Sequence, residues 1–336
     1  MKIWKINDAN QISRAETQEN LGDKIKVRVS RVALLETDFD TYLGKTADFK
    51  PIVPSKAALG LISDEDNPWG LKVGEKVLLS AYTPCGTCQS CLDNKPHCPN
   101  ISVRGVDTDG FLSDFAYVNK DCIFPIPEGV TDVECLFYDY ISVAISAMQR
   151  LHIEKGEYVA IFGSDVQSII FAEVVSYYQA IPIVISASAN AEKLALSHGV
   201  DYFVNPKKQN IQEKIFEITG GKMAEHAVYS VYSKDSLDSI FTVVHNGGNV
   251  GIIGYNKQTT NIKVDLNLLL SRQLNIYCIK EGHKEITSAI NMLAMKVINL
   301  SDFPTTTTNF GGVDKVFATY KPGKSQNFVI VDCNDA

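Results

Sequence analysis

Residues 158–188 read YVAIFGSDVQSIIFAEVVSYYQAIPIVISAS, and this stretch decides the fold. The run 158–162 is continuously apolar, as in a strand that is buried on both faces, and Gly163 ends it. Hydrophobic spacing predicts a helix over 166–180, and 183–185 is the next strand. A strand, a helix and a second strand in this order indicate a parallel sheet with a crossover helix.

The same alternation extends over residues 141–280. Helices are expected over 141–151 and 191–198, on either side of the first stretch. Three more strands are expected, with helices between them, over 201–204, 227–231 and 250–254. This pattern is typical of an α/β domain whose Rossmann-like, doubly wound parallel sheet is covered by helices on both faces. Beyond it, the sequence predicts a helix around 286–297 and a strand at 328–331.

Residues 1–140 have a different pattern. Polar and apolar residues alternate at the period of a strand over 24–29, and further strands are expected at 76–80 and 115–118. Turn residues separate these runs: Gly70, Gly74, Pro84, Gly110, Pro125, Pro127 and Gly129. The first part of the chain is therefore predicted to be a β-rich domain, distinct from the parallel sheet.

Four of the eight cysteines, Cys85, Cys88, Cys91 and Cys98, lie within the stretch 83–99. The first three are spaced C-x-x-C-x-x-C, and six residues separate the third from the fourth. Thiolates at this spacing can converge on one tetrahedral metal ion, and zinc is the usual occupant of an all-sulfur site. Four protein ligands leave no open position, so we expect one structural zinc ion per chain that holds the loop and does no chemistry.

A disulfide pair and an iron–sulfur cluster are the two alternatives to zinc for these cysteines. A disulfide framework is typical of secreted chains, but the sequence shows no secretory signal and its remaining cysteines are scattered among apolar neighbours: Cys122, Cys135, Cys278 and Cys333. The spacing also lacks the runs that are usual for iron–sulfur clusters. Thiols together with a thiolate zinc site favour a cytoplasmic location.

The composition limits the class of protein further. The chain has 336 residues, which is long enough for two domains, and 45% of them are hydrophobic. The net charge of −7 and the absence of a basic run argue against a nucleic-acid partner. No apolar stretch is long enough to span a bilayer, so no membrane partner is expected.

The cysteine stretch 83–99 resembles the structural-zinc lobe of the zinc-containing alcohol dehydrogenases, in the medium-chain dehydrogenase/reductase superfamily. The family usually has seven residues where this chain has six between Cys91 and Cys98. Segments 71–77 and 109–116 resemble the framework of the chaperonin-like β-barrel that opens the family. The resemblance covers nearly the whole chain and implies an oxidoreductase fold with a barrel domain and a Rossmann-like domain.

The resemblance also implies how the chain is divided and assembled. Residues 1–140 and 281–336 would form the barrel domain, with the zinc lobe at 83–99, and residues 141–280 would form the Rossmann-like domain. Family members are usually homodimers or homotetramers joined edge to edge through their parallel sheets. The edge strand would be 274–279, because an exposed apolar edge is an aggregation hazard unless it is paired.

The positions of the family's catalytic zinc ligands are altered in this chain. Leu35 stands where the family has a cysteine, Lys56 replaces a histidine, and Asp139 matches the third ligand. Leucine has no lone pair to donate, and a lysine ammonium repels a divalent cation. One carboxylate does not complete a three-ligand catalytic site, so we expect no catalytic zinc.

Three readings of the altered positions stay open. Lys56 either polarises a carbonyl in place of the metal, with Asp139 or Asp40 as its counter-charge, or only fills the space and pairs with Asp139. Thr37 matches the family's proton-relay hydroxyl, although a threonine at a strand end is also common for structural reasons. A third, conventional reading has a zinc ion rebuilt on replacement ligands such as Asp38 or Asp40.

The family's glycine-rich dinucleotide loop is also altered. The expected G-x-G-x-x-G appears as GSDVQS over residues 163–168, which keeps only the first glycine. The carboxylate of Asp165 either replaces the cofactor phosphate at the helix N-terminus, or caps the helix with its side chain turned away so that the phosphate is still admitted. The cofactor-binding positions implied here are Gly163, Ser164, Asp165, Val166 and Gln167.

The resemblance extends to the choice of cofactor. Ser186 stands where NAD-binding members have an acid, as in NADP-preferring plant-type alcohol dehydrogenases, and Lys193 loosely matches the lysine that meets their extra phosphate. Gly254 keeps a small residue against which the cofactor would lie. Tyr232 replaces a frequent glycine and would intrude on the nicotinamide end of the site.

These observations support two hypotheses of different classes. The first is an oxidoreductase that uses NADP, or else NAD, on a small-molecule substrate without catalytic zinc, reducing a C=O, C=C or C=N bond. The second is a non-catalytic binding or scaffold protein that keeps the fold. A conventional zinc alcohol dehydrogenase ranks third, and the NADPH or NADH titration described below distinguishes the first two.

Overall fold

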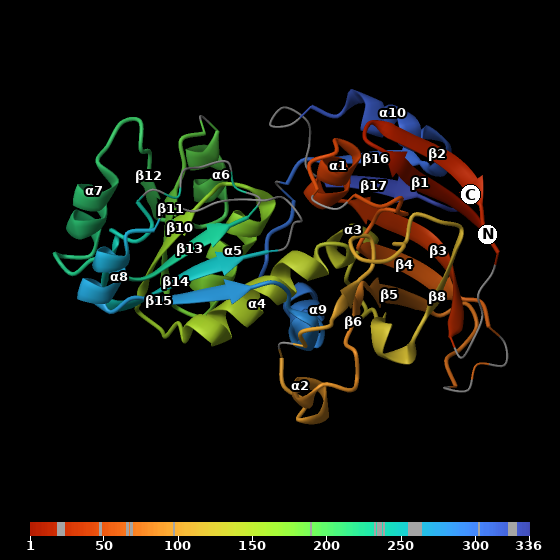
Figure 1. Cartoon of the computed structure of the whole chain (residues 1–336), viewed down its shortest axis with the longest axis horizontal. Coiled ribbons are helices and arrows are strands. Elements are labelled where there is room, and N and C mark those ends of the chain that lie inside the picture. The colour runs from red at the N-terminus through yellow and green to blue at the C-terminus, as the bar shows by residue number, and fades with distance from the viewer. Residues whose placement is uncertain are drawn as a thin grey trace. The chain divides into compact units, whose positions relative to one another are not determined.

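The computed structural model describes residues 1–18, 24–46, 49–64, 67, 70–96, 98–188, 190–231, 233, 237, 239–254, 264–301, 303–321 and 328–336. The chain forms two compact units (Figure 1). The barrel unit comprises Met1–Tyr138 and Phe303–Ala336, and the parallel-sheet unit comprises Asp139–Asp302.

The parallel-sheet unit contains six parallel strands in the order β12-β11-β10-β13-β14-β15. Their bounds are β10 Tyr158–Phe162, β11 Ile181–Ile185, β12 Tyr202–Val204, β13 Ala224–Ser230, β14 Val244–Ile253 and β15 Asn275–Ile279. Ala160 of the first strand lies opposite Ile183 on one side and Ala227 on the other. The strand order reverses between β10 and β13, which is the doubly wound topology that the sequence predicted, and this prediction is confirmed.

Helices accompany this sheet (Figure 1). They are α4 Tyr138–Leu151, α5 Val166–Tyr177, α6 Ala191–Ser197, α7 Ile211–Ile218, α8 Leu266–Arg272 and α9 Ile286–Ala294, with a 3₁₀ turn η2 at His283–Glu285. Residues 166–175 of α5 are all buried, which explains why most of them are apolar. Within the described part of the chain, no helix has the length and apolar character needed to cross a membrane.

The barrel unit is built on a seven-stranded mixed sheet in the order β16-β17-β3-β4-β5-β9, with β8 also paired to β3. The strands are β3 Ile25–Leu34, β4 Ala57–Ile62, β5 Lys76–Ser80, β8 Phe115–Val118, β9 Ile123–Pro125, β16 Thr305–Asn309 and β17 Phe328–Asp332. Two small antiparallel pairs accompany it, β1 Lys2–Asp8 with β2 Gln11–Glu16, and β6 Tyr82–Thr83 with β7 Ser102–Val103. Its helices are α1 Glu36–Tyr42, α2 Gln89–Leu92, α3 Asp132–Cys135 and α10 Val313–Thr319, with 3₁₀ turns η1 Lys120–Cys122 and η3 Phe310–Gly312.

Aromatic side chains fix the C-terminal segment against the start of the chain. The rings of Phe39 and Tyr320 stack with centroids 4.0 Å apart, and those of Phe137 and Phe328 stack at 3.8 Å. The indole of Trp4 donates a hydrogen bond of 2.7 Å to the carbonyl oxygen of Phe310, which lies 306 residues later. The barrel unit is therefore closed by residues from both ends of the sequence.

The boundary between the units differs from the expected one. Residues 281–302 were assigned to the barrel domain, but they lie in the parallel-sheet unit. Gly282 packs so closely on the backbone of Ser142 that an added Cβ would come within 2.2 Å of its carbonyl oxygen. The backbone N–H of Asn299 donates to the buried carboxylate of Glu173 on α5, at 3.1 Å from Oε2. These contacts hold α9 and the segment after it on the parallel-sheet unit.

Candidate functional site

Four thiols converge in the barrel unit, on the loop between β6 and β7. The sulfur atoms of Cys85, Cys88, Cys91 and Cys98 all lie within 4.8 Å of one another, and those of Cys85 and Cys91 are 4.0 Å apart. Zinc–thiolate bonds of about 2.3 Å in a tetrahedron place the sulfurs roughly 3.8 Å apart. The cluster therefore fits a structural zinc ion, held by these four side chains.

Local hydrogen bonds explain how the shortened loop still closes. The helix α2 carries Cys91, and the backbone N–H of Lys95 donates to the carbonyl oxygen of Ser90 at 2.7 Å, which turns the chain back. The backbone N–H of Cys85 donates to the sulfur of Cys98 at 3.3 Å. Backbone N–H groups of Thr87 and Cys88 lower the pKa of Cys85 to about 6, which favours the thiolate that a metal requires.

Asp38 and Lys56 are two buried ionisable residues of the barrel unit. The carboxylate of Asp38 accepts hydrogen bonds of 2.8 Å from the backbone N–H groups of Leu35 and Ser55. Burial raises the pKa of Asp38 to about 6, while these two hydrogen bonds and the charge of Lys56 act in the opposite direction. The side chain of Lys56 is itself buried, with 3% of the residue exposed. Asp38 thus supplies a counter-charge for this buried ammonium group.

The backbone before Lys56 is held in an unusual conformation. Ser55 has a φ of +84°, in the left-handed region that non-glycine residues rarely adopt. A Cβ on Gly105 would lie 2.7 Å from the carbonyl oxygen of Ser55, and one on Gly110 would lie 2.4 Å from that of Pro54. The hydroxyl of Tyr138 also donates to the carbonyl oxygen of Lys56 at 3.2 Å. Close packing from several directions therefore fixes the position of the backbone from which the Lys56 side chain extends.

The other positions matched to catalytic residues are also buried. Leu35 precedes α1 and has 2% of its surface exposed. The hydroxyl oxygen of Thr37 is buried and forms no hydrogen bond with the described residues. Asp139 belongs to the parallel-sheet unit, where it is buried in the first turn of α4. Asp40, one expected counter-charge for Lys56, forms an ion pair of 2.7 Å with Lys45.

The carboxylate of Asp165 occupies the N-terminus of α5, at the carboxyl end of β10. One oxygen accepts from the backbone N–H of Ser168 at 3.2 Å and from the hydroxyl of Ser230 at 2.9 Å. The other oxygen accepts from the hydroxyl of Ser168 at 2.6 Å. Burial raises the pKa of Asp165, and these three hydrogen bonds oppose that change. The carboxylate of Asp165 caps the helix and lies at its N-terminus. The backbone N–H of Ser168, a donor of the kind that binds a phosphate in an intact loop, therefore donates to Asp165 instead.

The remaining residues matched to cofactor binding lie around this loop or on the surface. Gly163 has a φ of +142°, and a Cβ there would come within 2.4 Å of the hydroxyl of Ser168. The hydroxyls of Ser164 and Ser186 are 3.1 Å apart. Val166 is buried, and the amide of Gln167 donates to the carbonyl oxygen of Tyr140 at 2.9 Å. Gly254 follows β14. Lys193 is exposed on α6. Tyr232 lies outside the residues that the structure describes.

Two residues of these sites were not identified from the sequence, Ser168 and Ser230, the partners of Asp165. Asp38 was named only as a possible replacement zinc ligand, and not as a counter-charge of Lys56. A signal existed for Ser168, which stands at the third glycine of the altered loop. Ser230 ends β13, the strand beside β10, and ligands of doubly wound sheets bind where the carboxyl ends of such strands diverge.

Comparisons with known proteins agree with this architecture. The model of the alcohol dehydrogenase GroES-like domain matches residues 22–128, and that of the zinc-binding dehydrogenase domain matches residues 170–295. An uncharacterised zinc-type alcohol dehydrogenase-like protein of Haemophilus influenzae is 25% identical over 300 residues, which is 87% of this chain and 86% of that protein.

Solved structures with the same fold extend over nearly the entire chain. A proposed zinc-binding dehydrogenase from Sinorhizobium meliloti, bound to NADP, has a TM-score of 0.86 at 17% identity, covering 99% of each chain. A short chain alcohol dehydrogenase from Escherichia coli, complexed with NADH, has a TM-score of 0.87 at 20% identity and covers 99% of each chain.

Proposed function

Because the chain belongs to the medium-chain dehydrogenase/reductase superfamily, among the zinc-type alcohol dehydrogenase-like proteins, we propose that it is an NAD(P)-dependent oxidoreductase without a catalytic zinc ion. Its metal would be the structural zinc of the four-cysteine cluster. Its substrate would be a small molecule with a C=O, C=C or C=N bond that accepts hydride.

The observation that carries this proposal is the burial of the Lys56 ammonium, with the carboxylate of Asp38 near enough to be affected by its charge. Lys56 stands at the position of a zinc-ligating histidine, and Leu35 stands at that of a cysteine. Neither an ammonium nor a hydrocarbon side chain binds zinc. Within the described residues of either unit, the only cluster of His, Cys, Asp or Glu suited to a metal is the four-cysteine one. An ammonium group supported by a carboxylate is a reasonable substitute for the positive charge of the metal.

The proposed roles follow from the chemistry of each side chain. A bound nicotinamide cofactor supplies or accepts the hydride. The ammonium of Lys56 stabilises the negative charge that develops on a substrate oxygen when its carbon receives the hydride. The hydroxyl of Thr37 passes a proton to that oxygen. Because the pKa of Asp38 is about 6, its carboxylate is largely ionised at neutral pH and offsets the charge of Lys56.

The network around Asp165 favours a second candidate, a binding or scaffold protein without turnover. A buried carboxylate beside a pyrophosphate would repel it, and Ser168 and Ser230 already satisfy that carboxylate. Under this reading the loop is complete without a cofactor. Dinucleotide binding distinguishes the two candidates.

Titration of the purified protein with NADPH and NADH, followed by nicotinamide fluorescence, tests the proposed function. We expect NADPH to bind about tenfold more tightly, which is a difference of about 1.4 kcal/mol, because Ser186 removes the acid that would repel the extra phosphate. Lys193→Gln should weaken NADPH binding several-fold and leave NADH binding unchanged. Lys207→Gln, which also removes an exposed lysine of the same unit, is the matched control. Tighter binding of NADH would contradict the cofactor assignment, and binding of neither would favour the scaffold protein.

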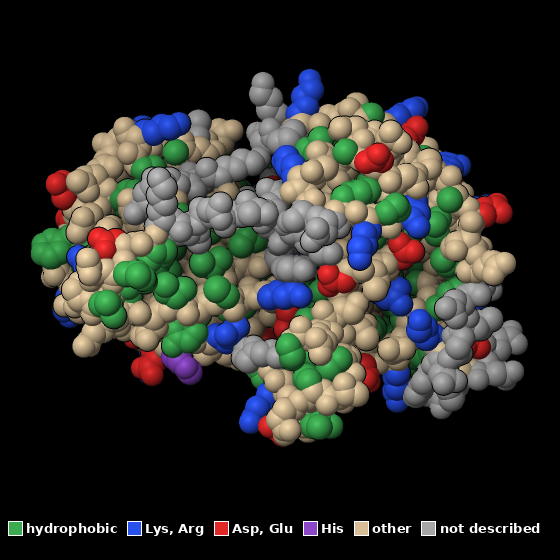
Figure 2. All heavy atoms as spheres, viewed as in Figure 1, with side chains coloured by type: hydrophobic (Ala, Val, Ile, Leu, Met, Phe, Trp, Pro, Cys, Tyr) green, Lys and Arg blue, Asp and Glu red, His purple; other side chains and the backbone are tan. Residues whose placement is uncertain are grey.

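We also propose that the protein forms homodimers or homotetramers through the edge strand β15. Hydrophobic side chains gather over the α8 and β15 end of the parallel-sheet unit (Figure 2). Leu270 is 76% exposed, Leu266 is 69% exposed and Ile276 is 43% exposed. An exposed apolar edge of this kind requires a partner, and pairing of two identical edges provides one.

Light scattering at micromolar concentration should therefore give at least twice the mass of one chain. The double variant Leu270→Lys with Ile276→Lys should shift the protein to monomers, because it buries two charges in the expected interface. Leu196→Lys is the matched control, since Leu196 is 56% exposed on α6 of the same unit. A monomeric wild-type protein would rule out this assembly.

A further inference from the structure

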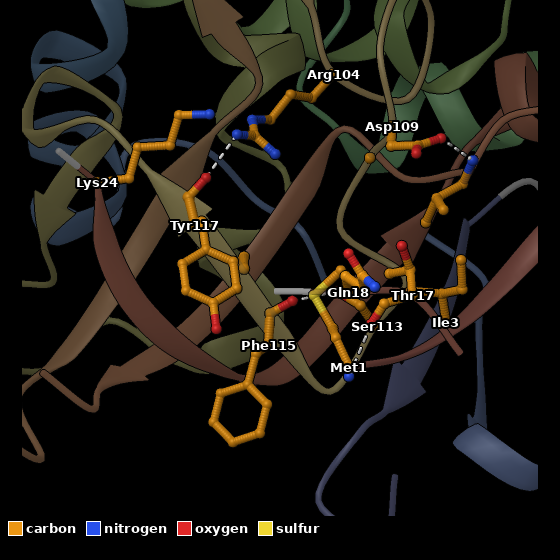
Figure 3. A pocket seen from close by; sticks show the side chains of 13 residues that line it. Met1, Ile3, Thr17, Gln18, Lys24, Arg104, Asp109, Ser113, Phe115 and Tyr117 are labelled. Carbon is orange, nitrogen blue, oxygen red and sulfur yellow. Dashed lines mark hydrogen bonds between the residues drawn. The ribbon is translucent and has the colours of Figure 1, made fainter. Parts of the chain in front are cut away.

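The barrel unit contains a cavity that none of the residues assigned to the zinc, catalytic or cofactor sites lines. It has a volume of about 210 Å³ and lies beside β1 and β8 (Figure 3). Lys24, Arg104, Asp109, Phe115 and Tyr117 are among its lining residues. None of the cysteines, catalytic positions or cofactor positions lines it, so what it binds is independent of the proposed function.

Two cationic side chains enter this cavity with few partners. Arg104 donates one hydrogen bond of 2.6 Å to the carbonyl oxygen of Tyr117, and its guanidinium lies 5.4 Å from the ring centroid of Phe111. It forms no ion pair with the described residues, and Lys24 forms neither a hydrogen bond nor an ion pair with them. Figure 3 shows the two side chains directed toward one another. Like charges that converge in a cavity repel unless an anion lies between them.

The wall next to these two groups adds a third positive charge. Lys26 lies opposite Tyr117 in the pairing of β3 with β8, and its ammonium nitrogen is 4.4 Å from the ring centroid of Phe115. Side chains two residues apart in an extended segment point to the same side, so Lys24 shares this face with Lys26. The positive potential of the cavity therefore extends along β3.

Negative charge in the cavity is limited. Asp109 is its one carboxylate among the described lining residues, and it accepts a hydrogen bond of 2.9 Å from the backbone N–H of Val53. Asp109 is near enough to Arg104 to favour the charged guanidinium, but burial has the larger effect and lowers the pKa of Arg104. A partly desolvated guanidinium with most of its N–H groups unused is a strong site for an oxyanion.

We propose that this cavity binds a small oxyanion, either a carboxylate or a phosphate group, between the side chains of Arg104 and Lys24. The planar guanidinium pairs with two oxygen atoms of the ligand, and the lysine ammonium adds a point charge. The rings of Phe115 and Tyr117 provide an apolar wall. At about 210 Å³ the cavity is smaller than a pocket for drug-sized ligands, so the ligand is inorganic phosphate or a short organic acid.

Isothermal titration calorimetry of the full chain at fixed ionic strength tests this site, with inorganic phosphate and malonate as separate probes. We expect one probe, or both, to bind one per chain with a Kd in the millimolar range or tighter. The probe that binds more tightly identifies the phosphate or the carboxylate as the natural group. Because Lys24 has no hydrogen-bond or ion-pair partner among the described residues, Lys24→Gln should leave the thermal midpoint unchanged and weaken binding about fivefold.

Arg104→Gln should weaken binding by at least about tenfold, since glutamine keeps a donor for the carbonyl oxygen of Tyr117 but loses the charge. The matched control is Lys72→Gln, which removes the same charge from an exposed lysine of the barrel unit and should leave binding unchanged. Absence of binding by both probes would overturn the proposal. Binding that is equally strong in wild type, Lys24→Gln and Arg104→Gln would also overturn it, because the anion would then lie elsewhere, including at the dinucleotide loop.

Discussion

Protein purified without added metal should contain about one zinc ion per chain. Four soft thiolates whose sulfurs lie within 4.8 Å of one another satisfy the tetrahedral preference of zinc. The positions of the family's catalytic ligands offer Leu35, Lys56 and Asp139, which are one hydrocarbon, one cation and one carboxylate. Elemental analysis by plasma mass spectrometry measures the ratio directly.

Two variants separate a structural zinc from a catalytic one. Cys88→Ser should lose nearly all of the zinc and lower the thermal midpoint, because binding of a structural zinc contributes to folding. Asp139→Ala should leave the zinc content at about one per chain. A wild-type ratio near two would mean that other side chains, such as those of Asp38 or Asp40, rebuild a catalytic site. A ratio near zero would mean that the six-residue spacing before Cys98 does not support the cluster.

Asp165→Gly should tighten the binding of NADPH by at least about tenfold. The substitution restores the second glycine of the loop, removes a buried negative charge and frees the backbone N–H of Ser168 for a phosphate. Two like charges about 4 Å apart repel by about 4 kcal/mol at an effective dielectric constant of 20, so tenfold is a cautious expectation. Fluorescence titration of wild type and variant measures the change.

Charge and shape at this position can be separated. Asp165→Asn keeps the size of the side chain and should recover part of the affinity if the charge is the obstacle. Asp265→Gly is the matched control, since Asp265 caps α8 in the same unit through the backbone N–H groups of Asn267 and Leu268. Affinity that rises in neither Asp165 variant would show that the carboxylate does not exclude the phosphate.

The affinity for NADPH should depend on pH through the protonation of Asp165. Burial raises the pKa of Asp165, so its carboxylate becomes protonated earlier than usual as the pH falls. The neutral acid no longer repels the pyrophosphate, so NADPH should bind wild type more tightly at low pH, over a range above the usual pKa of about 3.9. Asp165→Asn should lack this contribution.

Local sequence patterns were sufficient to predict much of this architecture. The apolar run 158–162 and the helix after it indicated the central parallel strand, because a strand buried on both faces needs an unbroken apolar sequence. The cysteine spacing predicted the metal cluster for a similar reason, since all four ligands lie on one short loop. The interpretation of Leu35, Lys56 and Asp165 as departures from the family's motifs rests on the resemblance and stays a prediction.

Contacts between distant segments were not predictable in this way. The hydroxyl of Ser230 reaches Asp165 only because β13 lies beside β10, and nothing in the residues around Ser230 indicates that neighbour. The contact of Gly282 with Ser142, which holds the segment after residue 280 on the parallel-sheet unit, likewise depends on the packed structure. The carboxylate of Asp38 accepts a hydrogen bond from Ser55, which precedes Lys56. Gly105 and Gly110, from a distant part of the sequence, pack against this loop.

The strand β17 is synthesised about 300 residues after β3, the strand with which it pairs. This strand pairs with β16 on one side and with β3 on the other, although β3 is made near the start of translation. A ribosome that has completed residues 1–301 has supplied every described element of the parallel-sheet unit, but β3 still lacks its neighbour. One edge of the barrel sheet therefore stays open while most of the chain is made. Unpaired edges of this kind can pair with other chains, so the barrel sheet exposes such an edge until residues 328–332 have been made.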